Sequence, residues 1–271
     1  MRKLLIIVAV ALLAVCCAKE KSPKILVLYY SQNGGTKAVA EAIQSKLGAD
    51  IEAIVPTIPY DGDFQATIER SRKELDGESP EIQPVVSDIN SYDVIFLGYP
   101  IWFGTYATPI ETVLKEIDLS GKKVVPFCTF GSGGLDSSIQ DLKKKLPDTE
   151  ILPGYGVRAA RVEDAPEEVE RFLVAGGFVE GEGQALEDFS EPRDVTPDES
   201  ALFDAAVGDY PMISAKAETV ASRAIPGGME YLFTAKDTPR EGMPDEMAGR
   251  AIKVYVLVED GKAPVFTQVV R

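Results

Sequence analysis

The sequence predicts an α/β fold, a doubly wound parallel sheet of five strands with helices on both faces, followed by a small α+β domain. Over residues 24–178, short apolar runs alternate with longer stretches whose apolar positions recur at helical spacing. Three of the apolar runs are followed by loops rich in glycine, hydroxyl or aromatic residues, as in open parallel sheets that bind a ligand. After residue 198 one helical stretch is followed only by strand-like runs, which is typical of an α+β unit.

The elements of the first domain alternate between strand and helix throughout. The predicted strands cover residues 25–30, 51–55, 93–98, 123–127 and 151–155. The predicted helices cover residues 35–47, 64–75, 109–117, 135–146 and 166–174. In the first helix Val39, Ile43 and Leu47 fall on one face, which indicates packing against the sheet. Because crossovers between parallel strands are right-handed, this order predicts a doubly wound sheet.

The first of the three loops, residues 31–36, has the composition of a phosphate-binding turn. Its glycines let backbone N–H groups approach an anion, the hydroxyls of Ser31 and Thr36 add donors, and a helix begins directly after it. The loop lacks both the Lys-Ser/Thr ending of a triphosphate loop and the spaced glycines of a dinucleotide fingerprint. A single phosphate is therefore favoured over ATP or NAD. An ordinary strand-to-helix turn with a Thr or Asn cap is the alternative.

The second and third loops carry aromatic residues. Trp102, the only tryptophan of the chain, lies beside Phe103 in the loop 99–106, and residues 128–134 combine Phe130 with three glycines. Large aromatic side chains on a loop are unfavourable unless they cover something. Because loops that follow parallel strands meet at one edge of the sheet, one could bind a phosphate while the others enclose a flat ring. That combination describes FMN.

Residues from about Lys24 to Phe178 resemble a flavodoxin, through Gly-Tyr-Pro-Ile-Trp-Phe-Gly from Gly98 and Pro-Phe-Cys-Thr-Phe-Gly-Ser-Gly-Gly from Pro126. The resemblance implies noncovalent FMN and the strand order 2-1-3-4-5. It implies phosphate contacts from Ser31, Gln32, Asn33, Gly34, Gly35 and Thr36. One side of the ring would be lined by Pro100, Ile101, Trp102, Phe103 and Gly104, and the other side by Thr129, Phe130, Gly131, Gly133 and Gly134. Asn33 and Gly34 stand where Thr and Gly are common in the family, so an amide replaces one phosphate-binding hydroxyl.

Composition narrows the function further. The net charge of −15 argues against nucleic acid as a partner. The absence of histidine excludes Ser-His-Asp chemistry and histidine-ligated metals. Cys128 is the only thiol after residue 17, so the folded body cannot form an intramolecular disulfide, and the position after an apolar strand indicates a buried structural thiol. No catalytic residue is assigned, because the flavin carries the electron chemistry.

The first 17 residues read as a signal peptide. A positive start is followed by an apolar run over residues 4–15, which is too short to span a bilayer, and by the pair Cys16-Cys17. The pair resembles a bacterial lipoprotein signal, which implies acylation of Cys17 or Cys16 and a membrane-anchored protein facing the periplasm or the exterior. Cys17 is favoured because a small residue precedes it. The alternative is an ordinary signal peptide cleaved near Ala18.

A second domain is predicted over residues 198–271, after an acidic linker at residues 179–197. It contains a helix at residues 199–207 and strands at 220–224, 229–235, 251–258 and 264–270, with a hairpin turn at 259–262. A helix followed by four antiparallel strands resembles cystatin-like domains. The inhibitory Gln-x-Val-x-Gly of that family keeps only its final glycine in residues 224–228, so a noncatalytic docking or spacing role is expected.

Two classes of function follow from these patterns. The first is an FMN-binding redox protein of the cell envelope, acting as an electron carrier or as an NAD(P)H-dependent oxidoreductase of quinone-type acceptors. The second is a surface lipoprotein whose flavodoxin-like body and cystatin-like tail act as a binding module without redox turnover. The three intact loops favour the first class.

Overall fold

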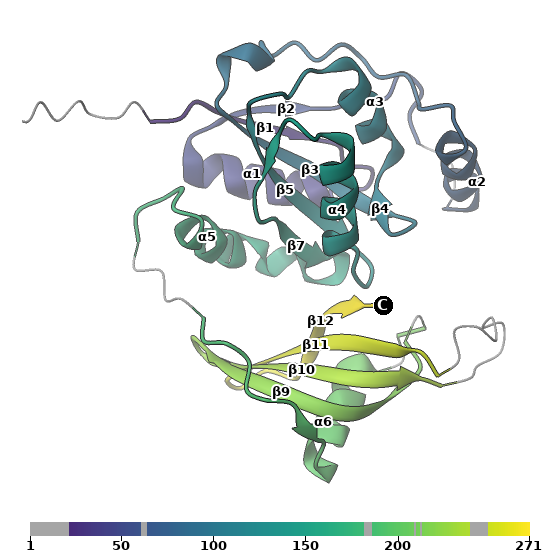
Figure 1. Cartoon of the computed structure of the whole chain (residues 1–271), viewed down its shortest axis with the longest axis vertical. Coiled ribbons are helices and arrows are strands. Elements are labelled where there is room, and N and C mark those ends of the chain that lie inside the picture. The colour runs from purple at the N-terminus through teal and green to yellow at the C-terminus, as the bar shows by residue number, and fades with distance from the viewer. Residues whose placement is uncertain (1–21, 61–63, 182–185, 209, 212, 239–248) are drawn as a thin grey trace, which may run out of the picture.

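The structure is a computed structural model that describes residues 22–60, 64–181, 186–208, 210–211, 213–238 and 249–271. A layered α/β domain and a separate antiparallel sheet lie one above the other along the long axis of the molecule (Figure 1). The predicted signal, residues 1–17 with Cys16 and Cys17, lies outside the described residues. Among the helices that are described, none is both long and apolar enough to cross a membrane.

The first domain is built on a parallel sheet. Its strands are β1 (Ile25–Tyr29), β2 (Asp50–Ala53), β3 (Val94–Trp102), β5 (Lys123–Phe130) and β6 (Glu150–Ile151), joined by β7 (Tyr155–Arg158) and the short β4 (Thr105–Tyr106). The order β2-β1-β3-β5-β6 with parallel pairing confirms the predicted order 2-1-3-4-5. The predicted fifth strand, 151–155, is wrong as one strand. It is split into β6 and β7 around Pro153, which has no N–H to donate to a ladder.

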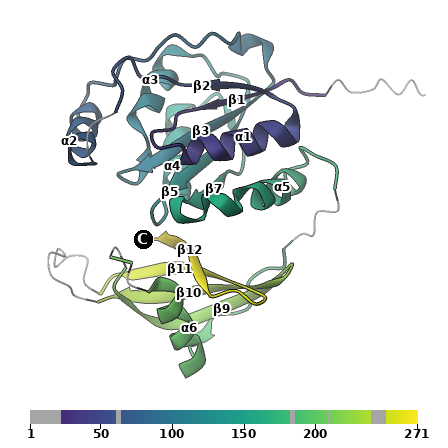
Figure 2. The ribbon, with the colours of Figure 1, turned by 180° about the vertical axis from the view of Figure 1, so that it is seen from behind.

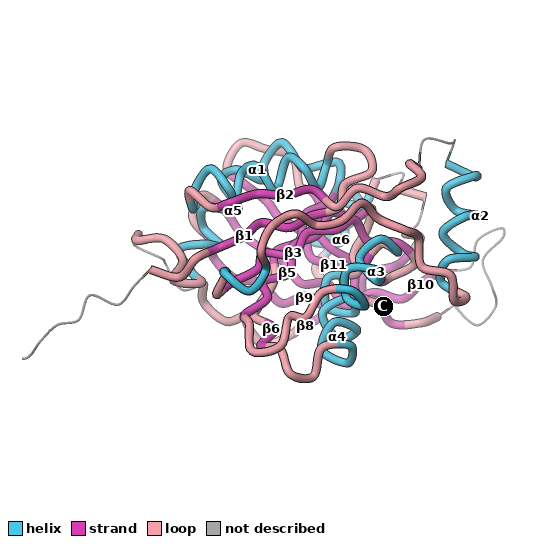
Figure 3. The backbone as a smooth tube through the Cα atoms, turned by 90° about the horizontal axis from the view of Figure 1, so that it is seen from above, coloured by secondary structure: helices cyan, strands magenta, loops and turns pink. Residues whose placement is uncertain are grey.

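Helices cover both faces of this sheet. They are α1 (Gly35–Leu47), α2 (Phe64–Leu75), α3 (Thr108–Glu116), α4 (Leu135–Lys145) and α5 (Ala165–Ala175), with two short 3-10 segments at Ile89–Ser91 and Ala159–Asp164. Helices α1 and α5 lie across one face, seen from behind in Figure 2, and α3 and α4 lie across the other. Figure 3 shows α2 set apart beside the layers.

The core is divided by the sheet into two clusters. Val39 and Ile43 of α1 pack with Val169 of α5 on one face, and Ile110 of α3 packs with Leu142 of α4 on the other, all five side chains fully buried. Strands β1 and β3 are buried on both faces, which explains their continuous apolar sequence. Each such side chain contributes about 1.5–3 kcal/mol by leaving water.

The segment 99–106, predicted as a loop, is instead a β-hairpin. Strand β3 continues to Trp102 and turns back into β4, with Ile101 opposite Tyr106 and Trp102 opposite Thr105. Phe103 and Gly104 form the two-residue turn, with φ values of 51° and 83°. Positive φ at both positions is the geometry that matches the twist of paired strands. Strand β5 likewise extends to Phe130, past the predicted end at residue 127.

The second domain is one helix on a meander of strands. Helix α6 (Pro197–Val207) begins at a capping box between Thr196 and Glu199. The strands are β8 (Arg193–Asp194), β9 (Ala215–Ile225), β10 (Gly228–Asp237), β11 (Ala251–Glu259) and β12 (Val265–Val270), in the antiparallel order β12-β11-β10-β9-β8. The buried ring of Phe203 on α6 contacts that of Phe233 on β10. The predicted helix and four strands are present; the first three strands are longer than expected, and the last begins one residue later than expected.

The predicted linker, residues 179–197, needs correction over its C-terminal half. Ser190 N donates to Ser222 O (2.9 Å), the ring of Phe189 lies 6.0 Å from that of Tyr255, and β8 pairs with β9. Residues from about 187 therefore belong to the second domain. The acidic composition of this stretch predicted a linker and gave no sign that Phe189 packs against the second domain.

Candidate cofactor site

The structure brings the three predicted loops together at the carboxyl edge of the parallel sheet. Thr36, at the end of the first loop, shares a hydrogen bond with Thr129 of the third (Oγ1 to Oγ1, 2.8 Å). Ile101 of the hairpin packs so closely on Gly134 that a Cβ there would lie 2.6 Å from the Ile101 Cγ2 atom. One site can therefore use all three loops.

The first loop ends at a helix whose N-terminus has no side-chain cap. Gly34 is the N-cap of α1, with a φ of 90°, and no side chain hydrogen-bonds there as a cap. The Oγ atom of Ser31 is buried and has no hydrogen-bond partner within the described part of the chain. The side-chain amide of Gln32 donates to Thr67 Oγ1 of α2 (3.2 Å). Asn33 Oδ1 accepts a long hydrogen bond from Gly35 N (3.4 Å). An orphaned hydroxyl beside an uncapped helix N-terminus fits a phosphate.

The Thr36–Thr129 pair also leaves a donor available. Both side chains are buried, with exposed fractions of 1% and 5%. Because each hydroxyl has one proton and only one proton is used between the two oxygens, the accepting hydroxyl keeps its own proton for a ligand. Thr36 was expected to bind phosphate directly, and the structure adds a partner from the third loop.

Trp102 belongs to a cluster of three aromatic rings beside the hairpin. Its ring centroid lies 5.0 Å from that of Tyr60 and 5.7 Å from that of Tyr30, both in edge-to-face arrangements. Trp102 is half-buried, while Phe103 at the hairpin tip is 49% exposed. Stacking of Trp102 on a flavin ring remains a prediction. Tyr30 was not anticipated here, since it closes an apolar run that indicated only core packing.

A largely buried acid of α2, Glu74, contacts this cluster. Glu74 accepts hydrogen bonds from Tyr60 Oη (2.5 Å) and Thr108 Oγ1 (2.5 Å) and pairs with Arg70 (2.7 Å), whose guanidinium lies 3.8 Å above the Tyr60 ring. Burial raises the pKa of Tyr60 and Tyr30, and the Glu74 carboxylate raises that of Tyr60 further. Both phenols therefore stay neutral at physiological pH. Arg70 and Glu74 of α2 thus face the aromatic cluster.

The third loop presents mainly backbone groups to the candidate site, because its large side chain is in the core. Phe130 is 3% exposed, and its ring packs over Gly156, so its side chain is part of the core. The carbonyl oxygen of Gly131 accepts from Arg158 Nε (2.9 Å), and that of Ser132 accepts from Val269 N (2.6 Å). Cys128 is fully buried and burial raises the pKa of its thiol, which agrees with the structural role expected for it.

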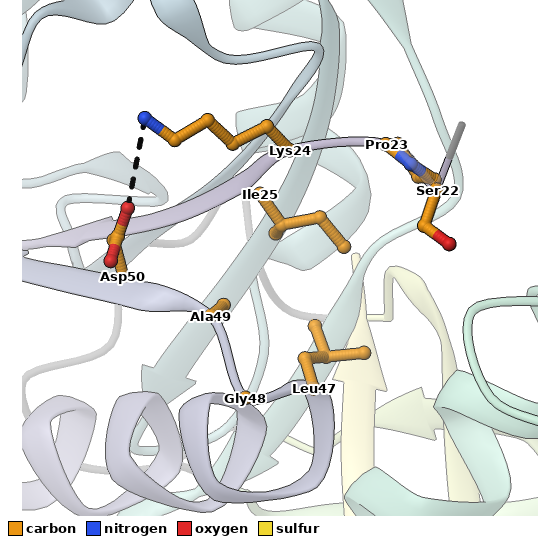
Figure 4. A pocket seen from close by; sticks show the side chains of 8 residues that line it. All are labelled: Ser22, Pro23, Lys24, Ile25, Leu47, Gly48, Ala49 and Asp50. Carbon is orange, nitrogen blue, oxygen red and sulfur yellow. Dashed lines mark ion pairs between the residues drawn. The ribbon is translucent and has the colours of Figure 1, made fainter.

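A hollow near the start of β1 lies at the opposite edge of the sheet (Figure 4). It is lined by residues 22–25 and 47–50, where Lys24 and Asp50 form an ion pair of 3.9 Å. Amino edges of parallel strands are not where ligands bind in doubly wound sheets. The converging loops are the candidate site.

Comparison with known proteins agrees with this geometry. The sequence model of the family described as Flavodoxin matches residues 24–170. This chain belongs to the flavodoxin family. Membership confirms the predicted fold class and supports FMN as the cofactor of the flavodoxin domain. The match ends before the second domain, whose resemblance to cystatin-like domains stays a prediction.

Two solved structures resemble the flavodoxin domain. One is described as a flavoprotein from Bacteroides eggerthii DSM 20697, with 32% identity and a TM-score of 0.51 over 56% of this chain and 97% of that one. The other, also described as a flavoprotein, is from Bacteroides uniformis ATCC 8492, with 26% identity and a TM-score of 0.50 over 55% and 99%. These similarities cover little more than half of this chain.

Curated relatives match over a shorter range. An NAD(P)H dehydrogenase (quinone) of Cupriavidus metallidurans is 32% identical over 98 residues, which are 34% of this chain and 46% of that protein. The chain spans less than half the length of the curated relatives it matches.

Proposed function

We propose that this chain binds FMN noncovalently and transfers electrons with it, as a carrier or as an NAD(P)H-dependent reductase of quinone-type acceptors. The observation that carries the proposal is the Ser31 hydroxyl, buried without a partner among the described residues, in the loop before α1; Thr36 and Thr129 join this loop to the third loop. The curated relative named as a quinone dehydrogenase motivates the reductase form.

The residues of the site divide into two roles. Ser31, the free hydroxyl of the Thr36–Thr129 pair and the first amides of α1 would bind the phosphate. The hairpin with Trp102 and the backbone of residues 131–134 would enclose the ring and keep water from it. When bound, FMN supplies both one-electron and two-electron transfer. The neutral hydroxyls of Tyr30 and Tyr60 place no charge beside the ring.

Titration of the purified full-length protein with FMN tests the binding step. Binding should give the visible flavin spectrum and quench flavin fluorescence. Ser31→Ala should weaken FMN by about tenfold or more, because a hydrogen bond to a charged group contributes about 1.5–3 kcal/mol. The same change should not lower the stability of the apoprotein, since it removes a buried hydroxyl that has no partner among the described residues. Ser91→Ala, at the amino edge, is the control for binding.

Oxidation of NADH or NADPH with a benzoquinone acceptor then separates reductase from carrier. Turnover by the FMN-loaded protein supports the reductase, whereas reversible photoreduction without pyridine-nucleotide turnover supports the carrier. A protein with no affinity for FMN would refute the redox proposal and leave the binding-module alternative.

We also propose that the protein works at the bacterial cell envelope, attached through an acylated Cys17 or Cys16. The proposal rests on the sequence of residues 1–17 alone. In that position the acidic surface and the second domain would face the periplasm or the exterior.

A further inference from the structure

The second domain is docked on the third ligand loop. Strand β12 lies below the carboxyl edge of the parallel sheet in both Figure 1 and Figure 2, and Val269 N donates to Ser132 O (2.6 Å). Val269 stands opposite Val254 of β11, and because its N–H is used by Ser132 it points away from that neighbouring strand. The loop therefore covers part of the outer edge of β12.

Arg158 joins the two domains at the same place. It ends β7, and its Nε donates to Gly131 O (2.9 Å) while its Nη1 donates to Phe266 O (3.2 Å) on β12. Its guanidinium lies 3.4 Å from the ring centroid of Phe266 and 5.1 Å from that of Tyr210. A planar cation held on a ring and by two carbonyl groups has little freedom to move.

The contact between the domains leaves no space for a side chain at Gly131 or Gly133 of the loop. A Cβ on Gly131 would lie 3.0 Å from Tyr210 Oη, and one on Gly133 would overlap the carbonyl oxygen of Val269. Phe266 is 2% exposed and belongs to the core of the second domain. The loop 131–134 thus packs against residues of the second domain, outside the flavodoxin domain.

We propose that Arg158 is a positioning residue of the flavin site, through which the second domain fixes the loop 131–134 and sets the affinity for FMN. The proposal rests on the proposed function. Because the loop would contact the ring on one side and the second domain on the other, ordering by either should favour the other.

Arg158→Met in the full-length protein tests this role. We expect faster amide hydrogen exchange in residues 131–134 of the apoprotein, and FMN binding weaker by about fivefold or more, from loss of a charged hydrogen bond that holds the loop. Arg158→Lys keeps the charge without the planar fork and should lie between the two. Arg223→Met is the matched control, because Arg223 also lies over a ring, that of Phe189 at 4.3 Å, but within the second domain.

A second variant addresses the contact from the other side. Tyr210→Ala removes the ring beside Arg158 and changes no residue of the flavodoxin domain; it should also speed amide exchange in the loop and weaken FMN binding. Unchanged exchange and unchanged FMN affinity in both variants, with normal binding by the unmodified protein, would overturn the positioning role. Failure of the unmodified protein to bind FMN would instead refute the proposed function, and loop exchange in the apoprotein would still decide whether Arg158 orders the loop.

Discussion

The hydroxyl pair of Thr36 and Thr129 allows a quantitative test of how the first and third loops are joined. Thr36→Val or Thr129→Val replaces one hydroxyl by a methyl group of similar size. In either single variant the remaining hydroxyl is buried without its partner, since both side chains are at most 5% exposed. An unpaired buried hydroxyl costs about 1–3 kcal/mol.

The double variant distinguishes this cost from a loss of packing. With both hydroxyls replaced, no polar group is left unpaired and the shape is kept, so the apoprotein should be nearly as stable as the unmodified protein. The coupling energy in the double-mutant cycle should then be about 1 kcal/mol or more. Each single change should lower the melting temperature by about 2–4 °C per kcal/mol.

Urea and thermal unfolding of the four apoproteins measures this cycle, and FMN titration of the same proteins measures the site. The double variant should bind FMN more weakly despite its recovered stability, because the free hydroxyl proton is lost. The pair Ser214 and Thr238, 2.6 Å apart in the second domain, is the control and should not change FMN affinity. Additive effects on stability, or full FMN affinity in the double variant, would refute the reasoning.

Three further predictions follow. Trp102→Ala should weaken FMN binding several-fold, since an aromatic pair contributes about 0.5–1.5 kcal/mol beyond burial. In the unmodified protein, FMN should quench the fluorescence of the only tryptophan, and unchanged tryptophan emission at saturating FMN would exclude stacking. Hydrogen bonds from Arg193 lower the pKa of Glu199 to about 2, so its contribution to stability is full above its usual pKa of 4.5 and is lost as pH falls towards 2; Glu199→Gln should flatten this pH dependence in urea unfolding of the second domain. Labelling with a palmitate analogue should require Cys17 or Cys16, and absence of such label would rule out the lipid anchor.

The first loop could be predicted because its chemistry is local. Glycines and hydroxyls between an apolar strand and a helical pattern indicate a phosphate turn without knowledge of any distant contact, and the structure places Ser31 and Gly34 there. The gathering of all three loops could also be predicted, since it follows from parallel strand order alone.

The hairpin and the split strand depended on weaker signals. Phe103 at φ 51° has none of the Asn-Gly or Asp-Gly character that marks a two-residue turn, so residues 99–106 gave no sign of pairing. Pro153 was a visible signal, and its lack of an N–H could have shown the break in the fifth strand.

The partners of the aromatic cluster and of the third loop could not be predicted from sequence. Glu74 looks like one of many charges on α2, and only the packing of that helix against Tyr60 buries it. Arg158 acquires its role from Phe266, 108 residues away in another domain. Contacts of this kind depend on how two units with separate cores meet.

The covered edge of β12 bears on whether the second domain can pair with other chains. Its other border, β8, is two charged residues long and offers little to a neighbouring chain, whereas β12 is six residues long with only Thr267 and Gln268 polar. Long apolar borders of this kind invite strand addition from another copy. A fragment beginning near residue 187 would carry that border uncovered and should self-associate or form fibres. The flavodoxin domain thus covers a strand edge through which the second domain could otherwise pair with another chain.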